Sequence, residues 1–248
     1  MSESWIVGIN PVQTVLKEGA ERVRELLFED GQRNPRVQGL RDMAKARGVD
    51  LRPVSREQLE AVSGGARHQG VAARCEASVA VTESDLPALL EAAGASALVL
   101  VLDGVTDPHN LGACLRSAAA ARATAVIVPK DRAVGLTAVA HRASAGGADL
   151  VPLIAVTNLA RALRQLKDAG LWLTGLAGDT GQSLYGLDLS GPTALVMGSE
   201  GEGLRRLTRD TCDYVAKIPM PGEMESLNVS VATGVALFEV LRQRGALK

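Results

Sequence analysis

Segments with the residue pattern of β-strands alternate with segments that have the pattern of α-helices from Ala95 to the end of the chain. Residues 98–102 form a continuous apolar run typical of a buried strand, and the Ala-rich residues 111–122 have helical spacing. Such alternation predicts an α/β fold with a mostly parallel sheet covered by helices on both faces. Further strands are expected at residues 125–128, 171–176, 194–197 and 214–218, and further helices at residues 158–169, capped by Asn158, and at about 227–243.

The residues before this region predict a smaller α/β unit. Its expected helices are residues 11–17 and 37–47, and its expected strands are residues 26–29 and 71–75. Residues 77–94 are Ala-rich and acidic and contain Pro87, a composition that favours a linker. We therefore expect a first domain at residues 1–76, a linker at 77–94 and a second domain at 95–248.

The charge of the chain gives a mixed indication about nucleic acid. Lys and Arg number 27 against 28 for Asp and Glu, and phosphate contacts favour an excess of cations. A basic run nevertheless contains one acid, Asp42, and five cations, Arg33, Arg36, Arg41, Lys45 and Arg47. This run is either a surface that faces phosphates or an ordinary solvated helix face. Aromatic residues make up 2% of the chain, which excludes base stacking as the main mode of recognition.

Other features of the sequence exclude several classes of site. The cysteines, Cys75, Cys114 and Cys212, are far apart, as expected in a reducing cytoplasm. No Cys or His pair has the spacing of metal ligands, so no metal is expected. The first residues lack the pattern of a signal peptide, and no apolar run is long enough to span a membrane. These features predict a cytoplasmic protein with no membrane contact.

Ligands of open parallel sheets bind beyond the carboxyl ends of the strands, and the end of the first predicted strand is polar. Asn110 stands where a helix cap belongs, and capping alone would explain it. Gly112 and Arg116 are four residues apart on one helix face. Glycine destabilises a helix, which suggests that something approaches Gly112 closely. We interpret Arg116 as a buried cation that holds a phosphate or carboxylate, with a structural ion pair as the alternative.

A second polar strand end lies at residues 196–204. Gly198, Gly201 and Gly203 would let a ligand touch the backbone there, although a plain tight turn is the alternative. The glycine order differs from a dinucleotide fingerprint, and no Lys-Ser/Thr pair follows as in a nucleotide-binding P-loop. Glu200 and Glu202 would also repel phosphates. The segment therefore disfavours a dinucleotide or a nucleoside triphosphate.

A third polar strand end lies at residues 218–230, where two prolines and a glycine make a stiff loop. Ser226 could cap the helix that follows, and this role alone would explain it. Beyond Asn228 the helix is apolar nearly all round, so it is buried in a core or against another subunit. Asn228 would then be a polar group beside a pocket, or a satisfied core Asn.

Together, the three segments resemble the motifs of the SpoU class of RNA ribose 2′-O-methyltransferases, in the SPOUT superfamily. Residues 110–116 resemble the first motif, residues 196–204 the second, and residues 218–228 with the following helix the third. Residues 8–12 and 67–71 resemble the substrate-binding domain that precedes the catalytic domain in many members, so the similarity covers nearly the whole chain. The sequence departs from the class at Asn10, where His is expected.

This resemblance implies a fold, a cofactor and partners. The catalytic domain is expected to contain a C-terminal trefoil knot, and the first domain to resemble the L30e-like RNA-binding fold. The expected cofactor is S-adenosyl-L-methionine, the expected partner is RNA, and the expected assembly is a homodimer with the last helix in its interface. Backbone groups of Gly198, Ile218 and Leu227 would hold the cofactor, with Met197, Gly203 and Met220 beside them.

The resemblance also implies residue roles and a substrate. Arg116 is expected to act as the base, although a guanidinium that stays charged could instead bind a phosphate and stabilise the developing alkoxide. Asn110 and Glu200 would orient Arg116, while Ser226 and Asn228 would shape the ribose site. Similarity within the class favours a guanosine of 23S rRNA as the substrate. The alternatives are ribose methylation of tRNA and an inactive RNA-binding protein.

Overall fold

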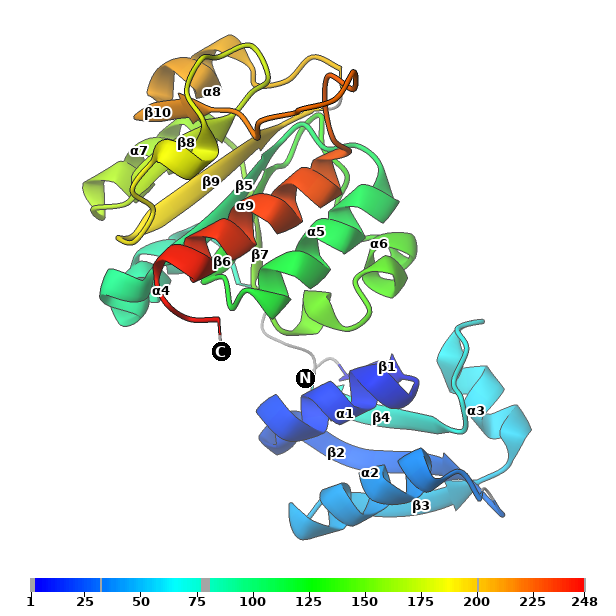
Figure 1. The fold of residues 1–248 in the computed structure, drawn as a ribbon. Helices are drawn as coiled ribbons and strands as arrows, with labels where there is room; N and C mark the ends of the chain where they lie inside the picture. The colour runs from blue at the N-terminus through cyan, green and yellow to red at the C-terminus, as the bar shows by residue number, and fades with distance from the viewer. Residues whose placement is uncertain (1–2, 32, 77–80, 200, 248) are drawn as a thin grey trace. The chain divides into compact units, whose positions relative to one another are not determined.

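The structure, a computed structural model, describes residues 3–31, 33–76, 81–199 and 201–247. Contacts divide the chain into two compact units, Met1–Val79 and Ala80–Lys248. Figure 1 colours both units in chain order. No helix in the described ranges is long and apolar enough to cross a membrane.

The first unit is built on a mixed four-stranded sheet. Its strands are β1 (Glu3–Val7), β2 (Val23–Glu29), β3 (Asp50–Val54) and β4 (Val71–Glu76). They lie in the order β1-β4-β2-β3, where β2 pairs parallel with β3 and the other neighbours pair antiparallel. The expected strands at 26–29 and 71–75 are confirmed as β2 and β4. Strand β3 has no clear sequence signal because it lacks a continuous apolar run and contains Pro53, which suits an edge position.

Helices cover both faces of this first sheet. α1 (Ile9–Glu18) and α2 (Pro35–Ala46) pack on the face that carries Leu26, while α3 (Arg56–Ser63) packs on the face that carries Leu27. The two leucines are adjacent in β2, so they point to opposite faces and each enters a separate core. The helices expected at 11–17 and 37–47 are confirmed as α1 and α2.

The second unit is built on a six-stranded sheet in which all neighbouring strands pair parallel. This confirms the expected parallel α/β fold, and every strand expected from the sequence is present. One further strand, β7, lies at the sheet edge and is only four residues long. Along the sheet the order is β10 (Tyr214–Ala216), β8 (Trp172–Leu176), β9 (Thr193–Gly198), β5 (Leu98–Asp103), β6 (Ala125–Pro129) and β7 (Leu153–Val156).

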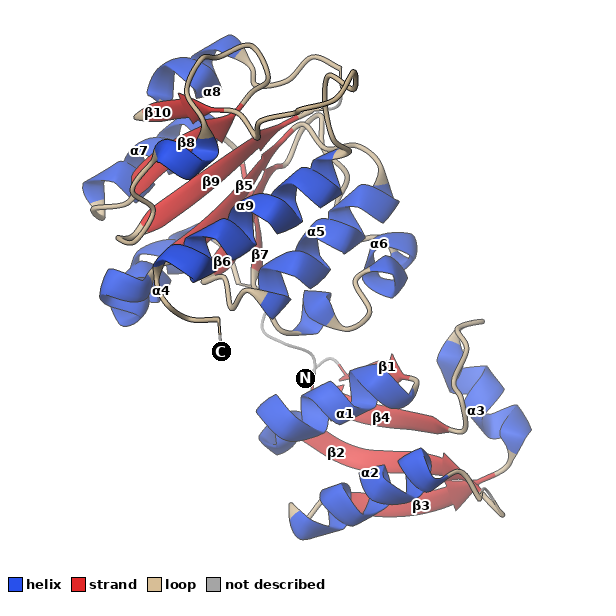
Figure 2. Ribbon diagram, in the orientation of Figure 1, coloured by secondary structure: helices blue, strands red, loops and turns tan. Residues whose placement is uncertain are grey.

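One face of this second sheet carries the helices that follow the first and third polar strand ends. α5 (Pro108–Ala120) and α9 (Val229–Gln243) lie side by side there, next to α6 (Ala138–Ala143), as Figure 2 shows. Buried side chains of all three helices join strand residues in one core, among them Leu111 and Leu237. The helices expected at 111–122 and 227–243 are confirmed as α5 and α9.

The opposite face carries α4 (Leu86–Ala93) and α7 (Leu159–Asp168), which bury their own apolar residues against the sheet. Asn158 caps α7 as predicted, because its side chain accepts a hydrogen bond from the Arg161 backbone N–H. α8 (Arg206–Thr211) lies next to α7. Short 3-10 helices of the described ranges are η1 (Ala20–Arg22), η2 (Glu83–Asp85), η3 (Gly94–Ser96), η4 (Gly147–Asp149) and η5 (Leu184–Gly186).

The segment expected to be a linker, residues 77–94, includes a helix of the second unit. Its residues 77–80 lie outside the described residues. α4 lies within it, and Leu86 and Leu90 of this helix are buried in a core of the second unit. The division between the units falls between Val79 and Ala80. An Ala-rich, acidic composition suits the exposed face of a short helix as well as a linker, so composition alone did not separate the two.

Gly112 in α5 is needed because α6 packs against it. A Cβ built on Gly112 would overlap the Ala140 carbonyl oxygen and would lie 2.5 Å from the Cβ of Ala143. The close approach inferred from the sequence is therefore made by another helix. α5 and η4 are equally close at Gly147, where a Cβ would lie 2.8 Å from the Arg116 Cα.

We predict that Gly112→Ala lowers the free energy of unfolding of the second unit by about 2 kcal/mol, because the added methyl group forces α5 and α6 apart. Gly234→Ala in α9 is the matched control, since a Cβ there meets only the Ser117 Oγ at 3.7 Å. Alanine should stabilise that helix by about 0.5–1 kcal/mol. Urea unfolding in a Trp5→Phe background, where Trp172 is the remaining tryptophan, would measure both. Equal stability of the two variants would contradict the packing argument.

Candidate active site

The parallel register of the second sheet brings the polar strand ends to one edge. Asp103 at the end of β5 is the partner of Gly198 at the end of β9, and Met197 is the partner of Leu176 at the end of β8. Leu176 in turn pairs with Ala216 at the end of β10. The loops that follow these strands therefore all begin at the same edge of the sheet (Figure 2).

Two candidate residues from different motif segments touch at this edge. The Asn228 Nδ2 donates a hydrogen bond of 3.1 Å to the Asn110 Oδ1, although the residues are 118 positions apart. Asn110 is 8% exposed, and it belongs to the first turn of α5. The first and third motif segments therefore converge, and the side-chain amides of Asn110 and Asn228 lie next to each other.

The two helix caps differ from the sequence expectations. Asp107 caps α5 by accepting a 2.8 Å hydrogen bond from the His109 N–H, so the interpretation of Asn110 as the cap is wrong. Asn228 caps α9, with its Oδ1 accepting from the Ser230 N–H at 2.9 Å and from the Ser230 Oγ at 2.6 Å. The expectation that Ser226 caps this helix is therefore wrong as well. Ser226 is exposed in the loop before it.

Arg116 is exposed, which corrects its interpretation as a buried cation. It lies six residues after Asn110 on α5, which corresponds to about 9 Å along the helix axis. Its side chain makes no hydrogen bond or ion pair with any residue that the structure describes. The backbone of Arg116 is fixed by η4, because Gly147 packs directly against it. The guanidinium is thus a solvent-facing cation on a rigid helix.

The loop after β9 folds back on itself around Gly198. Ser199 and Gly203 exchange two backbone hydrogen bonds of 3.0 Å, and Gly203 has a φ of +69°. A Cβ on Gly198 would overlap the Gly203 backbone, so glycine is required there by the loop itself. Met197 is 3% exposed and belongs to the core. Glu200, the expected partner of Arg116, lies outside the described residues.

An ion pair with a buried carboxylate, which the sequence does not reveal, fastens this loop to β5. The Asp103 carboxylate is completely buried and is paired with the Arg205 guanidinium, whose Nε donates at 2.5 Å. The Arg205 backbone N–H donates to the same carboxylate at 3.3 Å. The only sequence signal is an acid that ends a continuous apolar strand, since its partner is 102 residues away. This pair fixes the end of the second motif segment beside the first.

The third motif segment presents free backbone groups next to an apolar wall. Ile218, Met220 and Leu227 are half-buried, and Ile218 packs against the core beneath α9. The backbone N–H groups of Ile218 and Leu227 donate no hydrogen bond to any described residue. Such groups can bind a polar ligand that also fills an apolar space.

The loop after β8 packs against the third motif segment. Ser183 forms an isolated parallel bridge with Lys217, and their segments exchange backbone hydrogen bonds of 2.8 Å. A Cβ built on Gly178 would lie 3.9 Å from the Glu225 carbonyl oxygen. The loop after β8 therefore runs against the loop that carries Ile218.

Ionisable side chains near the strand ends offer no metal site and no thiolate. The described residues contain no group of three or more His, Cys, Asp or Glu side chains that could hold a metal ion. Burial raises the pKa of the Cys212 thiol to about 12, so it stays protonated at neutral pH.

His141 in α6 lies 3.2 Å from the Asp149 carboxylate, and this hydrogen bond raises the pKa of the imidazole. That pair ties α6 to η4, the two elements behind α5.

Comparison with known proteins decides the family. The sequence model described as the SpoU rRNA Methylase family matches residues 97–238, and the one described as RNA 2′-O ribose methyltransferase substrate binding matches residues 5–79. The chain belongs to the SpoU rRNA methylase family. The sequence resemblance is thereby confirmed over both units, and the converging loops contain the segments that carry it.

Several SpoU relatives match the chain along almost its whole length. The 23S rRNA (guanosine-2′-O-)-methyltransferase RlmB of Xanthomonas campestris is 56% identical over 97% of this chain and 96% of its own. The protein of the same name from Pseudomonas aeruginosa is 49% identical over 98% of both chains.

Solved structures of this family share the fold. A crystal structure of an RNA 2′-O ribose methyltransferase is 30% identical, with a TM-score of 0.74 over 98% of this chain and 89% of its own. The SpoU methyltransferase AviRb of Streptomyces viridochromogenes, at 24% identity, has a TM-score of 0.75 over 98% of this chain and 90% of its own. Both similarities extend over the two units, so the mixed sheet and the parallel sheet occur together in these relatives.

We predict that Arg205→Ala lowers the free energy of unfolding of the second unit by about 3 kcal/mol, because it leaves the Asp103 carboxylate buried without its cation. Arg206→Ala is the matched control, since that side chain is 95% exposed and its pair with Asp210 lies on the surface. Its effect should stay within about 0.5 kcal/mol. Urea unfolding followed by Trp172 fluorescence, again in the Trp5→Phe background, would compare them. If both variants unfold at the same urea concentration, Asp103 does not depend on Arg205.

Proposed function

We propose that the protein transfers a methyl group from S-adenosyl-L-methionine to the ribose 2′-hydroxyl of a guanosine in 23S rRNA. The observation that carries this proposal is the contact between Asn110 and Asn228, which joins the first and third motif segments at one sheet edge. Membership of the family and the near full-length similarity to RlmB proteins support a guanosine of 23S rRNA as the substrate. A ribosomal RNA substrate is consistent with a protein that acts in the cytoplasm.

The residues at this edge fit the proposed cofactor. Its purine needs an apolar wall and backbone donors, and the half-buried Ile218 and Leu227 supply both. Gly198 and Gly203 lie at the turn after β9, where Met197 precedes Gly198 at the strand end, and Met220 lies in the same loop as Ile218. When bound, the cofactor supplies an electrophilic methyl group on a sulfonium. These residues would bind it and orient the methyl group toward the ribose.

The chain's own side chains would prepare the ribose oxygen. A ribose hydroxyl is a weak nucleophile until it loses its proton, which would pass to water as the methyl group is transferred, and negative charge then develops on the oxygen. Arg116 is an exposed guanidinium on a fixed helix, so it can hold the adjacent phosphate and stabilise that charge. The paired amides of Asn110 and Asn228 would position the ribose hydroxyls. Ser226 would complete this ribose site, and Glu200 would orient Arg116.

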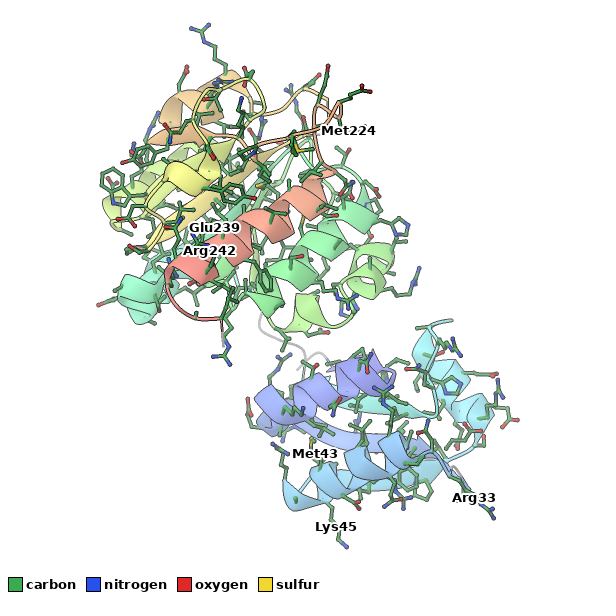
Figure 3. All side chains as sticks on the ribbon, viewed as in Figure 1. Arg33, Met43, Lys45, Met224, Glu239 and Arg242 are labelled. Carbon is green, nitrogen blue, oxygen red and sulfur yellow. The ribbon has the colours of Figure 1, made fainter. Side chains whose placement is uncertain are left out.

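The first unit would hold the RNA. The family description of residues 5–79 names substrate binding, and the basic run of the sequence lies there. Arg33 and Lys45 point away from the ribbon (Figure 3), where they can meet phosphates. Arg41 is engaged locally instead, with its guanidinium 4.0 Å from the centre of the Phe28 ring. Only part of the basic run is therefore free for RNA.

We also propose the C-terminal trefoil knot and a homodimer. The knot is supported by the bridge between Ser183 and Lys217, which holds the two loops against each other. The dimer is supported by α9, where Val231 and Phe238 are 51% and 41% exposed and lie seven residues apart on one helix face. An exposed apolar stripe on an otherwise buried helix favours contact with a second subunit.

Ribose 2′-O-methylation of tRNA is the alternative function within the family. A solved structure described by 2-OH methylation of C/U34 on tRNA is 28% identical but covers only 60% of this chain. The RlmB proteins, by contrast, match both units. The rRNA assignment is therefore favoured by the presence of the first unit.

We predict that the purified protein methylates a 23S rRNA transcript at a guanosine 2′-oxygen, and that Arg116→Ala lowers kcat by about 100-fold or more. Labelled S-adenosyl-L-methionine would measure turnover, and mapping of 2′-O-methyl positions would identify the nucleotide. Affinity for the cofactor, measured by calorimetry, should stay unchanged in the variant. Arg142→Ala on the neighbouring helix α6 is the control, because Arg142 is also an exposed Arg and should keep wild-type turnover.

Three outcomes would contradict this assignment. Wild-type turnover by Arg116→Ala at saturating RNA would remove Arg116 from the reaction. Methylation of tRNA but not of 23S rRNA would change the substrate. If the wild-type protein had no affinity for S-adenosyl-L-methionine, it would be an inactive RNA-binding protein.

We predict that Phe238→Asp converts the dimer into a monomer, because a carboxylate would be buried in the apolar contact between two α9 helices. Size-exclusion chromatography with light scattering would measure the mass. Leu207→Asp is the control, since Leu207 is 59% exposed on α8 and lies outside the α9 stripe. A wild-type protein that is monomeric at micromolar concentration would contradict the proposed interface.

A further inference from the structure

We propose that a pocket at the carboxyl ends of β6 and β7 binds one ribonucleotide of the RNA that flanks the methylated one. This inference rests on the proposed function, because it assigns a second contact for the same RNA strand. The pocket has a volume of about 390 Å³, within the range of about 300–1,000 Å³ that is usual for small-molecule sites. It is formed wholly by the second unit, between the strand ends, the start of α7 and α8.

Two guanidinium groups give the pocket its phosphate-binding character. Arg132 is exposed and makes no hydrogen bond or ion pair with the described residues. Arg205 is held in place by the buried Asp103 carboxylate, and its side chain remains 40% exposed. A guanidinium whose orientation is already fixed loses little entropy on binding a phosphate.

The segment that carries Arg132 is itself fixed. Arg132 has a φ of +59°, a conformation that non-glycine residues seldom adopt. Two residues later, the Val134 N–H donates a 3.0 Å hydrogen bond to the Val105 carbonyl, which ties the segment to the loop after β5. Tertiary contacts therefore maintain this strained conformation, as is common where a side chain must be aimed at a ligand.

The remaining lining suits the sugar and base of a nucleotide. The Asp131 carboxylate repels a phosphate near it but accepts hydrogen bonds from ribose hydroxyls and from base amino groups. Thr157 and Thr208 add hydroxyl groups. Leu207, which is 59% exposed, supplies an apolar surface on which a base can pack. The pocket thus offers a different chemistry for each part of a nucleotide.

The acid behind the lining is already paired with a cation of the protein, so it does not offset the positive charge of Arg132. Glu83 pairs with Arg161 at 2.6 Å beside the start of α7, and its carboxylate also accepts from the Thr157 N–H at 3.4 Å. Lys130 is exposed next to the pocket and adds to its positive potential. The start of α7 is therefore occupied by protein groups, and the helix end is not the binding element.

The pocket adjoins the candidate active site along the sheet edge. A Cβ built on Gly104 would lie 3.4 Å from the Ser199 Cβ and 3.9 Å from the Arg132 carbonyl oxygen. Gly104 thus stands between the pocket and the loop after β9. An RNA strand with its reacting ribose beside Asn110 can continue along this edge, so that the pocket receives a neighbouring nucleotide.

The test is RNA binding by the full chain as a function of salt. We expect Arg132→Gln to reduce the slope of log Kobs against log[KCl] by about 1 between about 50 and 200 mM KCl, because one phosphate contact is lost. Arg132→Glu should weaken binding of a 23S rRNA transcript by about tenfold or more at the lower salt concentration. Filter binding of the labelled transcript would measure both. Affinity for S-adenosyl-L-methionine should not change.

Arg206→Gln is the matched control, because this neighbouring Arg is 95% exposed but does not line the pocket. A wild-type slope for Arg132→Gln would overturn the proposal, as would an equal reduction by Arg206→Gln, which would indicate diffuse surface charge. Weaker cofactor binding with unchanged RNA binding would make the pocket part of the cofactor site, and would also overturn it. A wild-type protein that binds the transcript without methylating it contradicts the proposed function but leaves this pocket intact.

Discussion

The parallel pairing of β5 with β9 is the constraint on which the site depends. Parallel strands end at the same edge, and the register places Asp103 opposite Gly198. A shift of two residues would move the loops after these strands by about 7 Å relative to each other, and the Arg205 guanidinium would no longer reach the Asp103 carboxylate. The apolar strand cores therefore do more than bury surface. They set the positions from which three separate loops converge.

Asn228 shows how one side chain can serve the fold and the site together. Its Oδ1 caps α9 through Ser230, while its Nδ2 donates to Asn110 on α5. The start of α9 is thereby fixed against the start of α5, and the two helices lie side by side along their lengths. Because the cap and the contact use opposite ends of one amide, the orientation of the proposed ribose site is coupled to the packing of the helix pair.

Local patterns predicted most of the second unit, and contacts between distant residues explain what they missed. The apolar runs of β5, β6 and β9 and the Asn158 cap are visible in a few residues, so these elements were predictable. Strand β7 is too short to give a pattern. The burial of Arg116 and the cap at Asn110 were inferred from neighbours in sequence, but the Arg116 side chain is exposed and Asp107 provides the cap. The partner of Asp103 could not be found, because many cations in the chain could have paired with it.

Internal ion pairs also explain how a chain with a net charge of −1 can bind RNA. Many acids are neutralised by cations of the same unit, as in the pairs of Asp103 with Arg205 and of Asp179 with Arg209. On α9, Glu239 accepts two hydrogen bonds from Arg242, and Figure 3 shows the two residues next to each other. A neutralised pair contributes little potential at a distance, whereas an exposed Arg without a protein partner contributes its whole charge. Among the described residues, Arg116 and Arg132 are exposed cations that no acid neutralises, so the potential that a phosphate meets depends on them more than on the total charge.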